Sequence, residues 1–168
     1  MWSHPSQAGA DVADVLESLV ARGETLATAE SLTGGLLASA ITDVPGASRA
    51  FVGSVVSYAT RVKVAVLDVP AEVVDRHGVV SEECALAMAR GVRRRLDATW
   101  GVATTGVAGP DSQEGRPVGT VWVAVAGPDV VRARLLALEG DRRAIREATC
   151  EAAVSLLLDL LREEPGLR

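Results

Sequence analysis

The stretch Thr28-Ala-Glu-Ser-Leu-Thr-Gly-Gly35 lies between two apolar segments and predicts a strand that turns directly into a helix. Ser31 and Thr33 both suit a helix N-cap, because their hydroxyl oxygens accept hydrogen bonds from free backbone N–H groups. Gly34 and Gly35 let a ligand come close to the backbone. Free N–H groups at such a helix start attract a phosphate or a carboxylate. The stretch therefore predicts a strand–helix corner with an anion beside it.

Regular patterns continue on both sides of this corner. Apolar spacing and capping residues predict helices over 10–22, 33–42, 70–77, 81–96 and 141–162. Runs of β-branched and aromatic residues predict strands over 25–29, 51–58, 100–105, 118–126 and 130–138. Gly127-Pro-Asp129 joins the last two strands and is typical of an antiparallel hairpin. The segment 62–67 fits either a helix or a strand.

This order of elements predicts an α/β fold. Early alternation of strands and helices with a late hairpin indicates a three-layer α/β/α sandwich, whose sheet is mixed and mostly parallel. No repeat or linker interrupts the pattern, so we expect one domain over 9–165, preceded by a disordered tail over 1–8. We expect the central strands to be 25–30, 51–58 and 100–105.

Three polar residues fall at the ends of these expected central strands: Ser31, Tyr58 and Thr105. In an open α/β sheet, ligands bind in the crevice at the carboxyl ends of the strands. We therefore expect the three residues to meet in one crevice.

The composition excludes several classes of function. The 168 residues carry a formal net charge of -5 without a long basic run, which argues against nucleic-acid binding. No apolar run is long enough to cross a membrane and no signal-peptide pattern is present, so a cytoplasmic protein is expected. Cys84 and Cys150 lie in helical patterns without a CxxC partner, as core residues do.

The histidines do not predict a metal site or a serine–histidine triad. His4 and His77 are the only two, and no HxxH or CxxC spacing occurs, so a zinc site is not expected. A carboxylate-only Mg²⁺ site stays open as an alternative, although no cluster of Asp residues points to one. His77 precedes Gly78 at the end of a predicted helix, where a cation interacts favourably with the helix dipole.

Lys63 is the only lysine of the chain and becomes the candidate base. Arginine stays protonated, whereas a lysine can act as a base once desolvation lowers its pKa. Ser48, two residues after Gly46, and Tyr58, the only tyrosine, are candidate partners. Taken alone, a single lysine is usually a surface charge, and the default roles of Ser48 and Tyr58 are those of a turn serine and a packing tyrosine.

Eight segments, taken in order, resemble the C-terminal domain of the competence/damage-inducible protein A (CinA) family. They are Thr28-Ala-Glu-Ser-Leu-Thr-Gly-Gly35, Pro45-Gly-Ala-Ser48, Phe51-Val-Gly53, Tyr58 with Lys63, Gly78-Val-Val-Ser81, Thr105-Gly-Val-Ala-Gly-Pro110, Arg116-Pro-Val-Gly-Thr120 and Gly140-Asp-Arg142. The chain departs from the family pattern at Leu32, Ser54 and Arg116, where Cys, Gly and Lys are usual. None of these is a proposed catalytic group.

Stand-alone members of this family are nicotinamide-nucleotide amidohydrolases. The resemblance thus implies hydrolysis of nicotinamide mononucleotide to nicotinic acid mononucleotide and ammonia, by a Ser–Lys pair without metal or cofactor. Carried over by position, Ser48 is the nucleophile, Lys63 its base and Tyr58 the residue that orients them. Backbone N–H groups of the turn 47–49 are candidate donors to the oxyanion.

The resemblance also implies a pyridine-nucleotide pocket and a homo-oligomer, at least a dimer. The expected pocket residues are Ser31, Thr33, Gly34, Gly35, Thr105, Gly106 and Arg142, with Arg142 on the 5′-phosphate and Arg146 as its alternative. Two other hypotheses stay open: a non-catalytic nucleotide-binding or regulatory module of the same fold, and a different amide substrate such as free nicotinamide.

Overall fold

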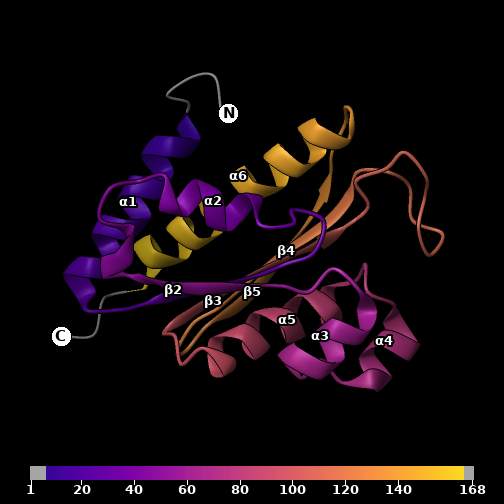
Figure 1. Ribbon diagram of the computed structural model, residues 1–168, viewed down its shortest axis with the longest axis horizontal. Coiled ribbons are helices and arrows are strands. Elements are labelled where there is room, and N and C mark those ends of the chain that lie inside the picture. The colour runs from indigo at the N-terminus through magenta and orange to yellow at the C-terminus, as the bar shows by residue number, and fades with distance from the viewer. Residues whose placement is uncertain (1–6, 165–168) are drawn as a thin grey trace.

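The computed structural model of the chain describes residues 7–164. Its helices and strands are α1 (Gln7–Arg22), β1 (Leu26–Glu30), α2 (Leu36–Thr42), the short 3₁₀ helix η1 (Ala47–Arg49), β2 (Phe51–Val56), α3 (Thr60–Leu67), α4 (Ala71–His77), α5 (Glu82–Arg95), β3 (Trp100–Gly106), β4 (Thr120–Ala126), β5 (Val131–Ala137) and α6 (Arg142–Glu163) (Figure 1).

The five strands form one mixed sheet in the order β2-β1-β3-β4-β5. β1 pairs in parallel with β2 and with β3, whereas β4 is antiparallel to both β3 and β5. The α/β sandwich with a late hairpin is therefore confirmed. The expectation of a central strand over 51–58 is wrong, because the β4–β5 hairpin extends the sheet from β3 and leaves β2 at the opposite edge.

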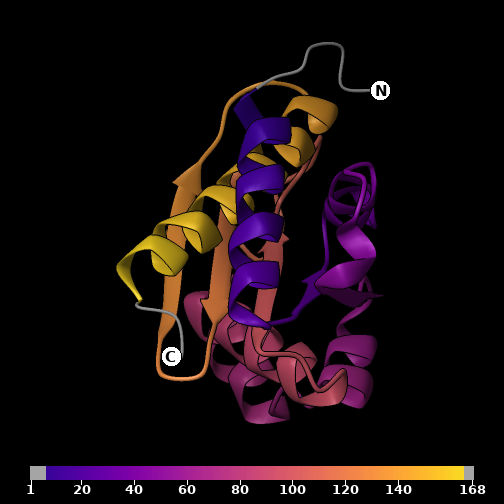
Figure 2. The same cartoon turned by 90° about the vertical axis from the view of Figure 1, so that its left-hand side faces the viewer.

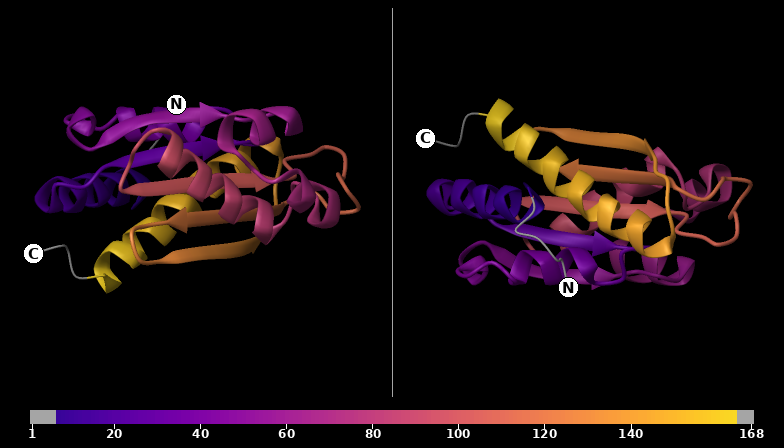
Figure 3. Two further views of the ribbon diagram at one scale, coloured as in Figure 1. Left: turned by 90° about the horizontal axis from the view of Figure 1, so that it is seen from below. Right: turned by 90° about the horizontal axis from the view of Figure 1, so that it is seen from above.

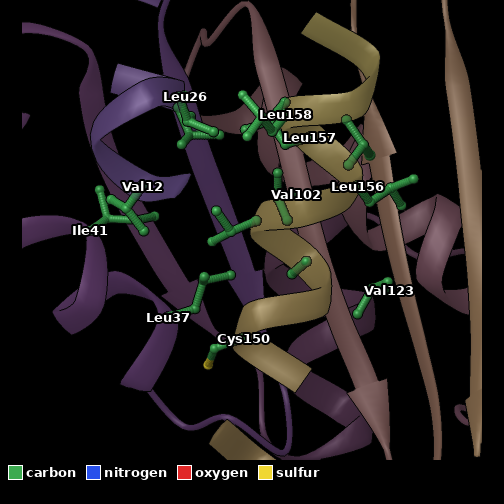
Figure 4. Packing of buried hydrophobic residues seen from close by; sticks show 14 of the residues in the cluster. Val12, Leu26, Leu37, Ile41, Val102, Val123, Cys150, Leu156, Leu157 and Leu158 are labelled. Carbon is green, nitrogen blue, oxygen red and sulfur yellow. The ribbon is translucent and has the colours of Figure 1, made fainter. Parts of the chain in front are cut away.

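Helices cover both faces of the sheet (Figures 1 and 3). α1, α2 and α6 pack on one face, and α1 and α6 lie side by side there (Figure 2). Their apolar side chains meet those of the strands in a cluster that includes Leu26, Leu37, Val102, Cys150 and Leu156 (Figure 4). α3, α4 and α5 pack on the other face, where Cys84, Met88 and Val92 are fully buried. The prediction that both cysteines are core residues is confirmed.

Several predicted boundaries shift. α1 begins at Gln7 and so includes the last two residues of the predicted tail, whose first six lie outside the described residues. The ambiguous segment 62–67 belongs to helix α3. α2 begins at Leu36 rather than at residue 33, because Gly34 and Gly35 adopt positive φ angles of 56° and 100° and keep the backbone in a turn.

Two predicted helix starts at the crevice end of the sheet carry side-chain caps. The Ser81 hydroxyl accepts a hydrogen bond of 3.2 Å from the Cys84 N–H and begins α5. The Asp141 carboxylate accepts one of 2.9 Å from the Ala144 N–H and begins α6. No helix among residues 7–164 has the length and apolar character needed to span a membrane.

Candidate active site

A pocket of about 170 Å³ opens where the carboxyl ends of β1, β2 and β3 meet. Ser31 follows β1, Tyr58 follows β2, and Thr105 belongs to the end of β3; all three line the pocket. The predicted meeting of these residues is therefore confirmed. Parallel strands place their carboxyl ends at the same edge of the sheet, which brings together residues far apart in the chain.

Lys63 reaches this pocket from α3, with only 1% of the residue exposed. Its Nζ donates hydrogen bonds to the Ser31 Oγ at 2.9 Å, to the Ser57 carbonyl at 2.6 Å and to the Tyr58 carbonyl at 3.2 Å. Burial lowers the pKa of the amine from its ordinary value of 10.5, and this effect outweighs the opposing influence of Cys84 and Glu114.

The two carbonyl contacts determine what the Lys63 amine can do towards Ser31. Carbonyl oxygens only accept hydrogen bonds, so each of them requires an N–H of the amine. Besides the Cε bond and these two N–H groups, a tetrahedral nitrogen has one position left, and Ser31 Oγ lies there. In the neutral amine that position holds the lone pair, which accepts the serine proton. The arrangement therefore suits a lysine base and a serine nucleophile.

Ser48 does not lie beside Lys63, and the predicted pairing of these two residues is wrong. Ser48 is exposed in η1, which precedes β2, whereas Lys63 follows β2. The six-residue strand between them separates the two ends by roughly 20 Å. The turn 47–49, the predicted source of oxyanion donors, lies with Ser48 at the far end, where Gly46 and Arg49 face residues of α1. Ser31, rather than Ser48, lies beside Lys63.

The predicted anion at the start of α2 is a carboxylate of the protein itself. Glu30, the fully buried last residue of β1, accepts hydrogen bonds from the backbone N–H groups of Gly35, Leu37 and Ala38 at 3.2, 2.9 and 3.1 Å. Its second oxygen also accepts a bond from the Ser54 hydroxyl at 3.2 Å. These N–H groups are therefore occupied by Glu30 and are not free for a phosphate.

Thr33, Gly34 and Gly35 support the corner instead of lining the pocket. The buried Thr33 hydroxyl pairs with the Thr104 hydroxyl at 2.8 Å. The Arg146 guanidinium of α6 donates to the carbonyls of Leu32 and Thr33, each at 2.9 Å. Arg146 is thus engaged with the backbone, and the alternative that it binds a phosphate is not supported.

Arg142 and Tyr58 lie together at the pocket lining. Arg142 donates to the Tyr58 hydroxyl at 3.1 Å and to the Gly109 carbonyl at 2.5 Å. Tyr58 is 61% exposed, and its backbone carbonyl, rather than its hydroxyl, contacts Lys63. The predicted contact by which Tyr58 orients Lys63 is therefore made by the backbone carbonyl of Tyr58 and not by its hydroxyl.

The end of β3 completes the pocket as predicted. Thr105 and Gly106 both line it, and the Thr105 hydroxyl donates to the Val79 carbonyl at 2.7 Å. A Cβ added to Gly106 would lie 2.7 Å from the Thr120 carbonyl oxygen, so no larger residue fits there without a shift of the backbone.

Sequence reasoning missed two contributors to the site. Ser57 supplies the shortest contact of Lys63 through its carbonyl, which carries no side-chain signature. Glu114, in the loop between β3 and β4, accepts hydrogen bonds from the N–H groups of Val79 and Val80 at 3.1 and 3.2 Å. Its charge also acts on the Lys63 pKa, and only tertiary folding brings the two residues together.

Metal-binding side chains do not gather in the described part of the chain. Among residues 7–164, no group of three or more His, Cys, Asp or Glu side chains is placed to hold a metal ion. Burial raises the pKa of Cys84, the thiol that acts on Lys63, to about 11. Cys84 is therefore a protonated thiol at neutral pH.

Comparisons with known proteins agree with this architecture. The chain is 53% identical to a CinA-like protein of Frankia casuarinae over 152 residues, which cover 90% of this chain and 35% of that protein. A CinA-like protein of Anaeromyxobacter is 50% identical, over 88% of this chain and 36% of its own length. The chain thus spans about a third of the length of these curated relatives.

Solved structures match along their whole length. A CinA superfamily protein of Klebsiella pneumoniae superposes with a TM-score of 0.91 at 32% identity, over 95% of this chain and all of the other. The competence/damage inducible protein CihA of Agrobacterium tumefaciens gives a TM-score of 0.90 at 32% identity, over 95% of this chain and 99% of the other. The model of the CinA C-terminal domain family matches residues 10–161. The chain therefore belongs to the CinA C-terminal domain family.

Proposed function

We propose that this chain is a metal-independent amidohydrolase that converts the carboxamide of a pyridine nucleotide, nicotinamide mononucleotide, to the carboxylate and ammonia. The observation that carries the proposal is the 2.9 Å contact between the buried Lys63 amine and the Ser31 hydroxyl. A hydroxyl within hydrogen-bond reach of a desolvated amine is the arrangement that nucleophilic catalysis by serine requires.

In the first half-reaction, neutral Lys63 takes the proton of Ser31 as its oxygen attacks the carboxamide carbon. The C–O bond forms and the carbonyl oxygen becomes an oxyanion. Collapse of this tetrahedral state breaks the C–N bond, and the Lys63 ammonium gives its proton to the leaving nitrogen, which departs as ammonia. The carbonyls of Ser57 and Tyr58 hold the amine in register throughout.

In the second half-reaction, water hydrolyses the ester on Ser31. Lys63, neutral again, takes a proton from the water as the new C–O bond forms. It returns a proton to the Ser31 oxygen as the ester bond breaks, and the carboxylic acid leaves. Water enters from the open pocket, which Thr105, Gly106 and Arg142 also line.

The choice of a nucleotide rests on Arg142 together with the family resemblance. Arg142 lies at the pocket with an exposed guanidinium, whose geometry suits a forked interaction with phosphate. Lys63 is the other basic side chain that lines this pocket, and it is buried beside Ser31. We therefore assign Arg142 to the 5′-phosphate, which would replace its bonds to the Tyr58 hydroxyl and the Gly109 carbonyl, while Lys63 serves the carboxamide.

The test is ammonia release by the purified chain from nicotinamide mononucleotide and from free nicotinamide, with and without a chelator. We expect release from the nucleotide, little from free nicotinamide, and no effect of the chelator. Lys63→Met, which keeps the length and apolar stem of the side chain, should abolish release. Binding of the nucleotide without any ammonia release would favour the non-catalytic binding module and overturn the proposal.

A further inference from the structure

The turn that carries Ser31 is held from the outside by α6. Arg146 donates through Nε to the Leu32 carbonyl and through Nη2 to the Thr33 carbonyl, each at 2.9 Å. The Gly34 N–H donates to the Ser31 carbonyl at 3.1 Å and closes the turn. These three bonds engage the carbonyl of every peptide group from Ser31 to Gly34.

These contacts determine where the N–H groups of the turn point. A trans peptide is planar, so its N–H points opposite to its C=O. The Ser31 carbonyl is directed at Gly34, which turns the Leu32 N–H the other way. The Leu32 carbonyl is directed at Arg146, which turns the Thr33 N–H away from α6. Arg146 thus holds the Leu32–Thr33 peptide directly. It acts on the Ser31–Leu32 peptide through the Thr33–Gly34 peptide, whose carbonyl it shares with the Leu36 N–H, a donor at 2.9 Å.

The two N–H groups so directed have no protein acceptor. Within residues 7–164, neither the Leu32 N–H nor the Thr33 N–H donates a hydrogen bond, although both residues are buried. Native proteins rarely leave a buried backbone N–H unpaired, and a group that is left so calls for an explanation. Leu32 directly follows the candidate nucleophile and lines the pocket.

We propose that the Leu32 N–H, which faces the pocket beside Ser31, is the oxyanion-hole donor, and that Arg146 is the positioning residue that holds the turn in which it lies. The inference rests on the proposed function, because it assigns a donor to the oxyanion formed when Ser31 attacks. Donors fixed before the reaction stabilise the developing charge without reorganisation. The turn at Leu32 thus replaces the turn 47–49 as the expected source of the oxyanion donor, because the turn 47–49 lies at the other end of β2.

The experiment measures acylation of Ser31 by 4-nitrophenyl acetate, an activated ester, from the nitrophenolate burst of the whole purified chain. The part of the burst that is lost in the Ser31→Ala variant gives the rate of acylation at Ser31. Arg146→Ala should lower it on the order of 10²-fold. It should also lower kcat for nicotinamide mononucleotide to a similar extent and leave KM within about twofold, because a positioning residue does not bind the substrate. Added guanidinium should restore part of the rate.

Arg143→Ala is the matched control. Arg143 lies on the same helix and is exposed, and its ion pair with Glu147 stays within α6. This variant should keep the wild-type rate of acylation and the wild-type KM. The melting temperature of each variant is measured alongside. If Arg146→Ala does not fold, Arg146→Lys provides the test, because a lysine lacks the rigid planar fork with which Arg146 holds the two carbonyls and should give a reduced rate.

The outcomes separate this inference from the proposed function. A folded Arg146→Ala or Arg146→Lys variant that acylates Ser31 at the wild-type rate overturns the inference, even if nicotinamide mononucleotide is hydrolysed. A rise in KM at unchanged kcat also overturns it and makes Arg146 a phosphate ligand. If the wild-type chain acylates Ser31 but releases no ammonia, the substrate assignment fails and the oxyanion hole stands. A wild-type chain without a Ser31-dependent burst overturns both.

Discussion

Replacing each of the two candidate serines by alanine is the sharpest test of the dyad. Ser31 Oγ lies 2.9 Å from the Lys63 amine, whereas Ser48 lies beyond the other end of β2, roughly 20 Å away. Loss of a serine nucleophile lowers kcat by about 10³- to 10⁶-fold, or about 4–8 kcal/mol of transition-state stabilisation. A hydroxyl so far away makes no contact with the reacting atoms. We therefore expect that large loss for Ser31→Ala and a change below about twofold for Ser48→Ala.

The assay is steady-state ammonia release from nicotinamide mononucleotide, with nucleotide binding measured by calorimetry for each variant. Ser31→Ala should still bind the nucleotide, because the pocket keeps its shape and Arg142 remains in place. The two variants control for each other, since both remove one hydroxyl. Full activity in Ser31→Ala together with a large loss in Ser48→Ala would refute the dyad and require another chain to bring Ser48 to the pocket.

Three further predictions follow from the same contacts. Only the neutral Lys63 amine can accept a proton, so kcat/KM should rise about tenfold per pH unit below the pKa of Lys63 and reach a plateau above it. Because burial lowers this pKa, the midpoint between rise and plateau should lie below 10.5. A pH–rate profile without this rise contradicts the lysine base. Glu30→Gln replaces the carboxylate oxygen that accepts hydrogen bonds from Ala38 and Ser54 by an amide nitrogen, which only donates. The free energy of unfolding, measured by urea denaturation, should fall by about 2–4 kcal/mol. Unchanged stability would show that these hydrogen bonds make no net contribution to the free energy of unfolding. Arg142→Ala should raise KM for the nucleotide with little change in kcat, and leave the kinetics with free nicotinamide unchanged; an equal effect on both substrates would argue against a phosphate contact.

Local sequence signals were enough to predict the fold class and most of the elements. The helical spacing of α6, the Ser81 cap of α5 and the Gly127-Pro-Asp129 turn all act over a few residues, and each appears in the structure. The position of β2 at the edge could not be predicted in this way. Strand order depends on which neighbour the hairpin joins, a choice made by long-range packing.

For the site, the sequence determined the components: a sole lysine, a serine-bearing corner after β1, and the strand ends at which ligands bind. Only the tertiary structure decided which serine meets the lysine and which anion occupies the start of α2. Separation along the sequence favours Ser48 as the partner of Lys63, because Ser48 precedes the lysine by 15 residues and Ser31 precedes it by 32. Parallel pairing of β1 and β2 reverses that order in space, because Ser31 and Lys63 both follow their strands, whereas Ser48 precedes β2.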